Sequence, residues 1–305
     1  MRIAIVGAGA LGLYYGALLQ RGGNDVRFLL RRDYDAIMAG GLRVFSTGGD
    51  FHLARVAGFR RPEEIGEVDL VVVGLKAFVN DRYAELVAPL VGRNTLILTL
   101  QNGLGNEEGL AALFGPDRIF GGVAFLCSNR GVPGEVHHLG AGRILLGALC
   151  SEKMAEAEMI ATVFRSAGID CSAVSDLRKA RWEKLVWNIP FNGICALTGR
   201  TVADVLSSES GSRLARNLMA EVIAAANAQG LSEPLAADFA ARMITFSAGL
   251  GPYRPSMMID REEGRPLELE AIFAIPLERG AMKGVPMPCV ETLAGLLGLA
   301  VAVAP

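Results

Sequence analysis

The chain has little histidine and little net charge, and both shortages restrict what it can bind. Three histidines among 305 residues are too few for a typical transition-metal site, so we expect no bound metal. A net charge of −2 argues against a nucleic-acid partner, because binding phosphate groups needs a basic surface. Hydrophobic residues make up 51% of the chain and charged residues 20%, which is typical of a globular protein and excludes a disordered one.

Paired cysteines and long apolar runs are also missing. The five cysteines show neither a C-x-x-C pair nor the spacing of zinc ligands, and an odd, scattered set indicates free thiols in a reducing compartment. The apolar tail at 293–305 is shorter than the roughly 20 residues that span a membrane. Glycines interrupt the N-terminus where a signal peptide needs an unbroken apolar stretch. We therefore expect a soluble cytoplasmic protein without a membrane partner.

The N-terminal residues follow the pattern of a βαβ unit. An apolar run at 2–6 predicts a strand, glycines follow it, residues 10–20 predict a helix and residues 26–30 predict a second strand. Two later runs, 69–76 and 95–100, are mostly apolar and do not alternate with polar residues, as in parallel strands that are covered on both faces. This part of the chain therefore predicts a mostly parallel sheet.

Strand patterns end near residue 176, and helical periodicity replaces them. We predict an α/β fold with a Rossmann-type N-terminal domain, residues 1–175, and an all-α C-terminal domain, residues 176–305. The remaining predicted strands are 41–45, 51–56, 121–128, 135–140 and 143–148, and the remaining predicted helices are 81–90, 106–114, 152–168, 177–197, 207–229, 234–249, 266–284 and 289–300.

The sequence "GAGALG" follows the first strand and opens the first helix. Gly7, Gly9 and Gly12 form the pattern G-x-G-x-x-G, which in this context indicates a dinucleotide site. The glycines allow a tight turn, close approach of a pyrophosphate and close packing of helix on strand, and the helix N-terminus attracts the anion. The predicted cofactor-binding residues of this turn are Gly7, Ala8, Gly9, Ala10, Leu11 and Gly12. A tight turn without a ligand is the structural alternative.

The residues after the second strand indicate which dinucleotide binds. An NAD site needs Asp or Glu there to hold the ribose 2′-hydroxyl, whereas this chain has Arg31 and Arg32. A guanidinium binds a 2′-phosphate through charge-assisted hydrogen bonds, so we predict NADP(H), with Arg31 as a cofactor-binding residue. The residues do not decide whether Arg31 or Arg32 makes the main contact, and two solvated arginines are the structural alternative.

Two more polar positions follow buried strands. Lys76 follows the run at 69–75, and Gln101-Asn102-Gly103 follows the run at 95–100. Ligands of open parallel sheets bind beyond the carboxyl ends of the strands, so we predict that Lys76 and Asn102 bind the cofactor. A lysine in such a place is otherwise an ordinary surface residue.

The sequence "KLVWNIPFN" puts polar residues into an apolar helix. Lys184, Asn188 and Asn192 are spaced i, i+4, i+8 and share one stripe, and Pro190 predicts a kink between them. Buried carboxamides are costly unless they form hydrogen bonds, so a polar ligand is one explanation of the stripe. A purely structural polar stripe is the other.

These motifs, together with the pattern S-x3-D…E at 256–268, occur in the order found in the ketopantoate reductases (2-dehydropantoate 2-reductases), and the chain resembles that family over nearly its whole length. The resemblance implies a Rossmann-type domain that binds NADPH and a helical domain that binds substrate. It also implies reduction of ketopantoate to pantoate, on the route to pantothenate and coenzyme A. Composition alone leaves the segment 254–270 open, because a charge-rich stretch is usually a solvated face.

The resemblance also implies roles for single residues. Lys184 matches the family's proton-donating lysine and Glu268 its essential glutamate, which would accept a hydrogen bond from the substrate hydroxyl and help to position the lysine. The substrate-binding residues implied are Asn102, Lys184, Asn188, Asn192 and Ser256, with Ser256 on the substrate carboxylate.

One position departs from the family pattern. Some members carry a further substrate-binding asparagine beyond the second helix asparagine, where this chain reads "GRTVAD", with Val202 nearest. A different 2-oxo acid therefore stays open as the substrate. A β-hydroxyacid dehydrogenase or another distant two-domain enzyme of this kind, and a non-catalytic NADP(H)-sensing module of the same fold, also stay open. The apolar C-terminal helix leaves a homodimer open as well.

Overall fold

The computed structural model describes residues 1–302, and its chain separates into two compact units. The first unit contains residues 1–101 and 106–177, and the second contains Asn102–Gly105 and the chain from Arg178 onward. The sequence did not predict that the short segment Asn102–Gly105 groups with the helices. The functional roles of the predicted domains 1–175 and 176–305 stay predictions.

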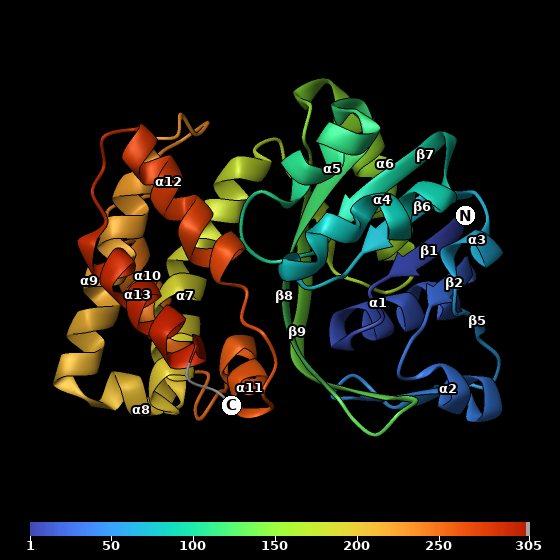
Figure 1. The fold of residues 1–305 in the computed structure, drawn as a ribbon, viewed down its shortest axis with the longest axis horizontal. Coiled ribbons are helices and arrows are strands. Elements are labelled where there is room, and N and C mark those ends of the chain that lie inside the picture. The colour runs from blue at the N-terminus through green and yellow to red at the C-terminus, as the bar shows by residue number, and fades with distance from the viewer. Residues whose placement is uncertain (303–305) are drawn as a thin grey trace. The chain divides into compact units, whose positions relative to one another are not determined.

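The first unit is built on a ten-stranded sheet with the order β4-β3-β9-β8-β7-β6-β1-β2-β5, with β10 paired to β9 (Figure 1). The pairs from β5 through β2, β1, β6 and β7 to β8 are all parallel, and β8 and β9 form a long antiparallel hairpin. This confirms the predicted α/β fold with a mostly parallel, Rossmann-type sheet. The strands are β1 (Arg2–Val6), β2 (Asp25–Leu29), β3 (Leu42–Ser46), β4 (Phe51–Leu53), β5 (Ala57–Phe59), β6 (Val68–Val73), β7 (Val91–Thr99), β8 (Ile119–Arg130), β9 (Glu135–Ala148) and β10 (Cys171–Ala173).

Helices cover both faces of this sheet, which explains why the interiors of its central strands are mostly apolar. On β1, Ile3 and Ile5 pack into the cluster that includes α1 and α6, whereas Ala4 and Val6 pack into the cluster that includes α4 and α5. The helices of this unit are α1 (Ala10–Arg21), α2 (Tyr34–Gly40), α3 (Pro62–Ile65), α4 (Tyr83–Val87), α5 (Asn106–Phe114) and α6 (Met154–Ser166), with short 3₁₀ segments η1 (Ala77–Arg82), η2 (Ala88–Leu90), η3 (Pro116–Arg118) and η4 (Ser151–Lys153).

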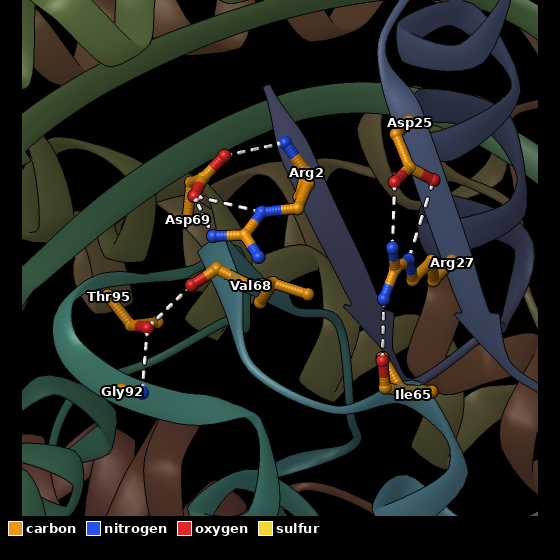
Figure 2. A network of polar contacts seen from close by, with 8 residues as sticks. All are labelled: Arg2, Asp25, Arg27, Ile65, Val68, Asp69, Gly92 and Thr95. Atoms are coloured by element: carbon orange, nitrogen blue, oxygen red, sulfur yellow. Dashed lines mark hydrogen bonds and ion pairs between the residues drawn. The ribbon is translucent and has the colours of Figure 1, made fainter.

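The amino ends of the central strands are tied together by polar contacts (Figure 2). Asp69 accepts hydrogen bonds from the backbone N–H and the guanidinium of Arg2, and Arg27 donates to the Ile65 carbonyl at 2.7 Å. Thr95 Oγ1 donates to the Val68 carbonyl at 2.5 Å and accepts from the Gly92 N–H at 2.9 Å. The polar groups at this edge of the sheet are therefore hydrogen-bonded to one another. The glycine turn lies at the opposite edge, where the strands have their carboxyl ends.

The second unit is helical, as predicted. Its core includes Phe191, Met219 and Val290, which are fully buried and come from three different helices. Its elements are α7 (Leu177–Thr198), α8 (Val202–Ser207), α9 (Glu209–Asn227), α10 (Phe239–Ala248), α11 (Ser256–Glu262), the π-helix η5 (Glu270–Ala274), α12 (Ile275–Met282) and α13 (Pro288–Ala302).

In two helices of this unit, a side chain from another helix caps the first turn. Asn192 Oδ1 on α7 accepts from the backbone N–H of Met257, in the first turn of α11, at 3.1 Å. The carboxylate of Glu221 on α9 accepts from the N–H groups of Cys289 and Val290, in the first turn of α13, at 2.9 and 3.0 Å. Both contacts satisfy N–H groups that have no partner within their own helix.

Several predicted elements differ from the structure. The segments 135–140 and 143–148 are one strand, β9, because the chain stays extended through a bulge where Ala141 has φ +60°. The predicted helix 81–90 is a short α-helix between two 3₁₀ segments. The predicted helix 266–284 starts only at Glu270, as a π-helix. The elements β5, β10, α2, α3, α8 and α11 were not predicted.

Candidate functional site

The glycine turn has the geometry that a pyrophosphate needs. Gly7 has φ +99°, and a Cβ on it would lie 2.4 Å from the Gly74 carbonyl carbon. A Cβ on Gly12 would lie 2.2 Å from the Gly7 oxygen, so the helix packs closely on the turn. Gly9, the N-cap of α1, faces open space, with nothing within 4 Å of an added Cβ. No side chain caps α1, and its first N–H groups therefore fit an anion.

The end of β2 is followed by two exposed arginines, Arg31 and Arg32, and by the buried carboxylate of Asp33. Arg31 and Arg32 are exposed, and neither forms an ion pair within the part of the chain that the structure describes. Asp33 follows them but is only 3% exposed, because its carboxylate pairs with the Arg130 guanidinium and accepts from the Gly134 N–H at 3.2 Å. Sequence reasoning missed Asp33 and Arg130, since a partner so distant along the chain leaves no local pattern.

The carboxyl ends of β6 and β7 lead to the predicted Lys76 and Asn102. Lys76 is half-buried at the N-cap of η1, and its carbonyl accepts from the Val79 N–H at 3.0 Å. Gln101, two residues after the end of β7, is buried within a hydrogen-bonded set of side chains. Asn102 is the first residue of the loop that groups with the second unit.

Asn102 and Lys184 meet in the second unit. Lys184 Nζ donates to Asn102 Oδ1 at 2.6 Å, so the structure brings together two of the predicted substrate-binding residues. The pKa of the half-buried Lys184 is lowered from 10.5 to about 7, mainly by burial and also by the Arg181 charge, whereas the Glu268 charge opposes the shift. Glu268 is 5% exposed. Of the two predicted catalytic residues, Lys184 is therefore half-buried and Glu268 is buried.

The two helix asparagines differ in what they contact. Asn188 is 3% exposed, and its Nδ2 has no hydrogen-bond partner among residues 1–302. Asn192 is also buried, but its Oδ1 caps α11 through the Met257 N–H and lies 3.5 Å from Ser256 Oγ. The polar stripe therefore includes one carboxamide nitrogen available for a ligand and one carboxamide oxygen used by the fold.

The remaining predicted positions are also located. Ser256 is exposed at the first residue of α11. Val202 is fully buried at the start of α8, where its N–H donates to the Tyr253 carbonyl at 3.0 Å, so its side chain belongs to the helical core. Within residues 1–302 no cluster of three metal-binding side chains occurs. No helix in the same range has the length and apolar character to cross a membrane.

Comparison with known proteins gives matches along almost all of the chain. A sequence model described as "Ketopantoate reductase PanE/ApbA" matches residues 3–150, and one described as its C-terminal part matches residues 176–300. A 2-dehydropantoate 2-reductase of Nostoc sp. is 39% identical over 96% of this chain and 92% of its own length. The corresponding protein of Mesorhizobium japonicum is 32% identical over 97% of both chains. A crystal structure of 2-dehydropantoate 2-reductase from Geobacter metallireducens has 62% identity and a TM-score of 0.97, and covers 98% of this chain and 100% of its own.

Proposed function

Because the chain belongs to the ketopantoate reductase family, we propose that it reduces 2-dehydropantoate (ketopantoate) to (R)-pantoate with NADPH, in pantothenate and coenzyme A biosynthesis. The observation that carries the proposal is the contact between Lys184 Nζ and Asn102 Oδ1, with a lysine pKa near neutrality. An amine that titrates near the working pH is suited to donate a proton.

The first unit fits a nicotinamide dinucleotide. The turn at Gly7, Gly9 and Gly12 offers backbone N–H groups and open space for the pyrophosphate. Arg31 and Arg32 support NADP(H) over NAD(H), since both are exposed and cationic. Asp33, the carboxylate that could otherwise hold a ribose 2′-hydroxyl, is held by Arg130 and Gly134.

The proposed reaction forms an alkoxide at the keto oxygen. The bound nicotinamide supplies a hydride to C2 of the 2-oxo acid. The Lys184 ammonium stabilises the charge that develops on the oxygen and then donates a proton to it. Asn102 accepts one of the three ammonium hydrogens. Glu268 favours the protonated amine and would accept a hydrogen bond from the product hydroxyl.

Substrate binding is assigned to the polar residues around Lys184. Asn188 supports this role because its buried Nδ2 lacks a partner within residues 1–302, and an unsatisfied buried donor is costly until a ligand oxygen accepts from it. Asn192 contributes through its nitrogen and by fixing the first turn of α11, which begins at Ser256. Ser256 would bind the substrate carboxylate through its hydroxyl.

Steady-state kinetics test the proposal directly. The purified protein should reduce ketopantoate with NADPH at a higher kcat/KM than other 2-oxo acids such as pyruvate or 2-oxoisovalerate. A higher value for another 2-oxo acid would favour that substrate instead, which the buried Val202 leaves open. NADPH binding without turnover of any 2-oxo acid would favour the sensing module.

The location and the assembly state also belong to the proposal. All five cysteines are free thiols, which supports a reducing compartment such as the cytoplasm. A homodimer has one supporting observation: α13 buries Val290 and Leu297 but leaves Leu296 and Leu299 exposed. Sedimentation equilibrium decides between monomer and dimer.

A further inference from the structure

One carboxamide joins the two ends of the loop that carries Asn102. The loop Asn102–Gly105 begins after Gln101 and ends before Asn106. Asn80, on the 3₁₀ segment η1, contacts both of these flanking residues. Gln101 Nε2 donates to Asn80 Oδ1 at 2.8 Å, and Asn80 Nδ2 donates to Asn106 Oδ1 at 2.9 Å. The carbonyl oxygen and the amide nitrogen of the Asn80 side chain therefore both bind residues at the base of the loop.

The flanking residues are fixed by further buried contacts. Gln101 is 3% exposed, and its Oε1 accepts from Tyr83 OH at 2.6 Å and from Thr99 Oγ1 at 2.9 Å. Asn106 is fully buried at the first residue of α5. A buried network whose members are all hydrogen-bonded is rigid, and removing one member takes a hydrogen-bond partner from each of its neighbours.

The loop itself allows little freedom beyond this base. Gly103 has φ +82°, and a Cβ on it would lie 2.3 Å from the Ala271 oxygen. The Leu104 N–H donates to that same carbonyl, within the π-helix η5, at 2.9 Å. Glu268, the proposed catalytic carboxylate, lies two residues before the start of η5. The loop therefore contacts the helix that directly follows this residue.

We propose that Asn80 is a positioning residue for the proton donor: by joining Gln101 to Asn106, it fixes where Asn102 Oδ1 meets Lys184 Nζ. Asn80 acts through Asn102 and needs no contact with the reacting atoms. The inference rests on the proposed function, because it takes Lys184 as the group that donates the proton. A carboxamide is required, since the position must both accept and donate a hydrogen bond.

The test compares Asn80→Leu with the wild-type enzyme. The variant keeps a side chain of similar size and loses both hydrogen bonds. We expect kcat to fall about tenfold or more, as expected for a misplaced catalytic group, while KM for the 2-oxo acid changes much less. An oxygen acceptor favours the charged amine, so a displaced Asn102 should also move the alkaline limb of the kcat profile to lower pH.

Thr95→Val is the matched control. Thr95 is a buried residue of the same unit with two hydrogen bonds, and it lies at the amino edge of the sheet. We expect this variant to lower Tm and to leave kcat and the pH profile unchanged. Equal kcat values and identical pH profiles for Asn80→Leu and Thr95→Val would overturn the proposal.

A double variant separates positioning from general destabilisation. If Asn80 acts through Asn102, then Asn80→Leu should have little further effect on kcat in an Asn102→Ala background, because the two changes interrupt one interaction. Full multiplication of the two separate losses would contradict the proposal.

A titration of the free protein distinguishes this inference from the proposed function. In protein with ¹³C-labelled lysine, the Lys184 resonance, assigned by its absence in Lys184→Met, should titrate at lower pH in Asn80→Leu than in wild type. An unchanged titration would overturn the positioning role. A shifted titration in a protein that reduces no 2-oxo acid would support the positioning role and contradict the proposed function.

Discussion

Lys184 is the residue on which the proposed chemistry depends, and its surroundings set its pKa. Burial removes water from the amine and lowers the pKa to about 7, while Glu268 favours the charged form. Asn102 accepts one of its hydrogens at 2.6 Å. The residue is therefore partly protonated at neutral pH and can supply a proton to an oxygen that gains charge.

The pH dependence of the reaction follows from this pKa. The proposed donor is the protonated amine, so kcat/KM for reduction should be level below about pH 7 and fall as the pH rises through the lysine pKa. Initial rates at constant ionic strength, from pH 5.5 to 9.5, measure this limb. A level profile up to pH 9 would contradict the assignment of Lys184 as the titrating donor.

Removal of the amine tests the same residue. We expect Lys184→Ala to lower kcat on the order of 10²-fold or more, because a general acid contributes about this much. The NADPH dissociation constant, measured by fluorescence titration, should change little, since the glycine turn belongs to the other unit. Near-normal turnover in Lys184→Ala would refute the mechanism.

The proposed preference for NADPH over NADH depends on Arg31 and Arg32 at the end of β2. We expect Arg31→Ala to raise KM for NADPH far more than KM for NADH, because only NADPH has a 2′-phosphate for the guanidinium to bind. The matched variant Arg32→Ala decides which arginine makes the main contact. An equal rise in KM for both cofactors in Arg31→Ala would count against the predicted role.

Some residues of the proposed site could be predicted from the sequence and others could not, for physical reasons. Lys184 and Asn188 were recognisable because polar side chains at helical spacing are unusual in an apolar helix. Asn80 was not, because its stretch "AFVNDR" has no pattern and its partners Gln101 and Asn106 are brought to it only by folding.

At the level of helices and strands, periodicity predicted the interior of most elements, and distant contacts decided where several begin. The runs that form β1, β6 and β7 are apolar because both faces of the sheet are covered. The helix α11 was missed because its segment is rich in charge and its first turn is capped by Asn192, from another helix. A cap of this kind leaves no signal in the neighbouring residues.

The cap of α13 can be tested by substitution. Glu221→Ala removes the acceptor of two backbone N–H groups, so we expect the free energy of unfolding to fall by about 1–2 kcal/mol, as for other lost helix caps. Glu233→Ala, which removes an exposed carboxylate beside Lys179, is the control and should have almost no effect. Urea unfolding of both variants measures the difference. Equal stability of the two variants would show that Glu221 contributes no cap.

At the scale of the whole chain, the two-part organisation was visible in the sequence as a change from strand patterns to helical periodicity. The assignment of Asn102–Gly105 was not visible, because these residues follow a strand and precede a helix of the first unit. They group with the second unit only through contacts such as Leu104 with Ala271. Sequence order alone does not encode that association.

This assignment of Asn102–Gly105 restricts how such a protein can evolve. Suppose that recombination replaced everything after Leu177 with the corresponding part of another protein. Asn102 would then come from the first parent and the lysine at position 184 from the second, so the two side chains would not have evolved together. Chimeras joined at that point should therefore inherit a mismatch at their reactive centre. New substrate preferences in this lineage are then expected to arise by successive point substitutions and not by exchange of gene segments.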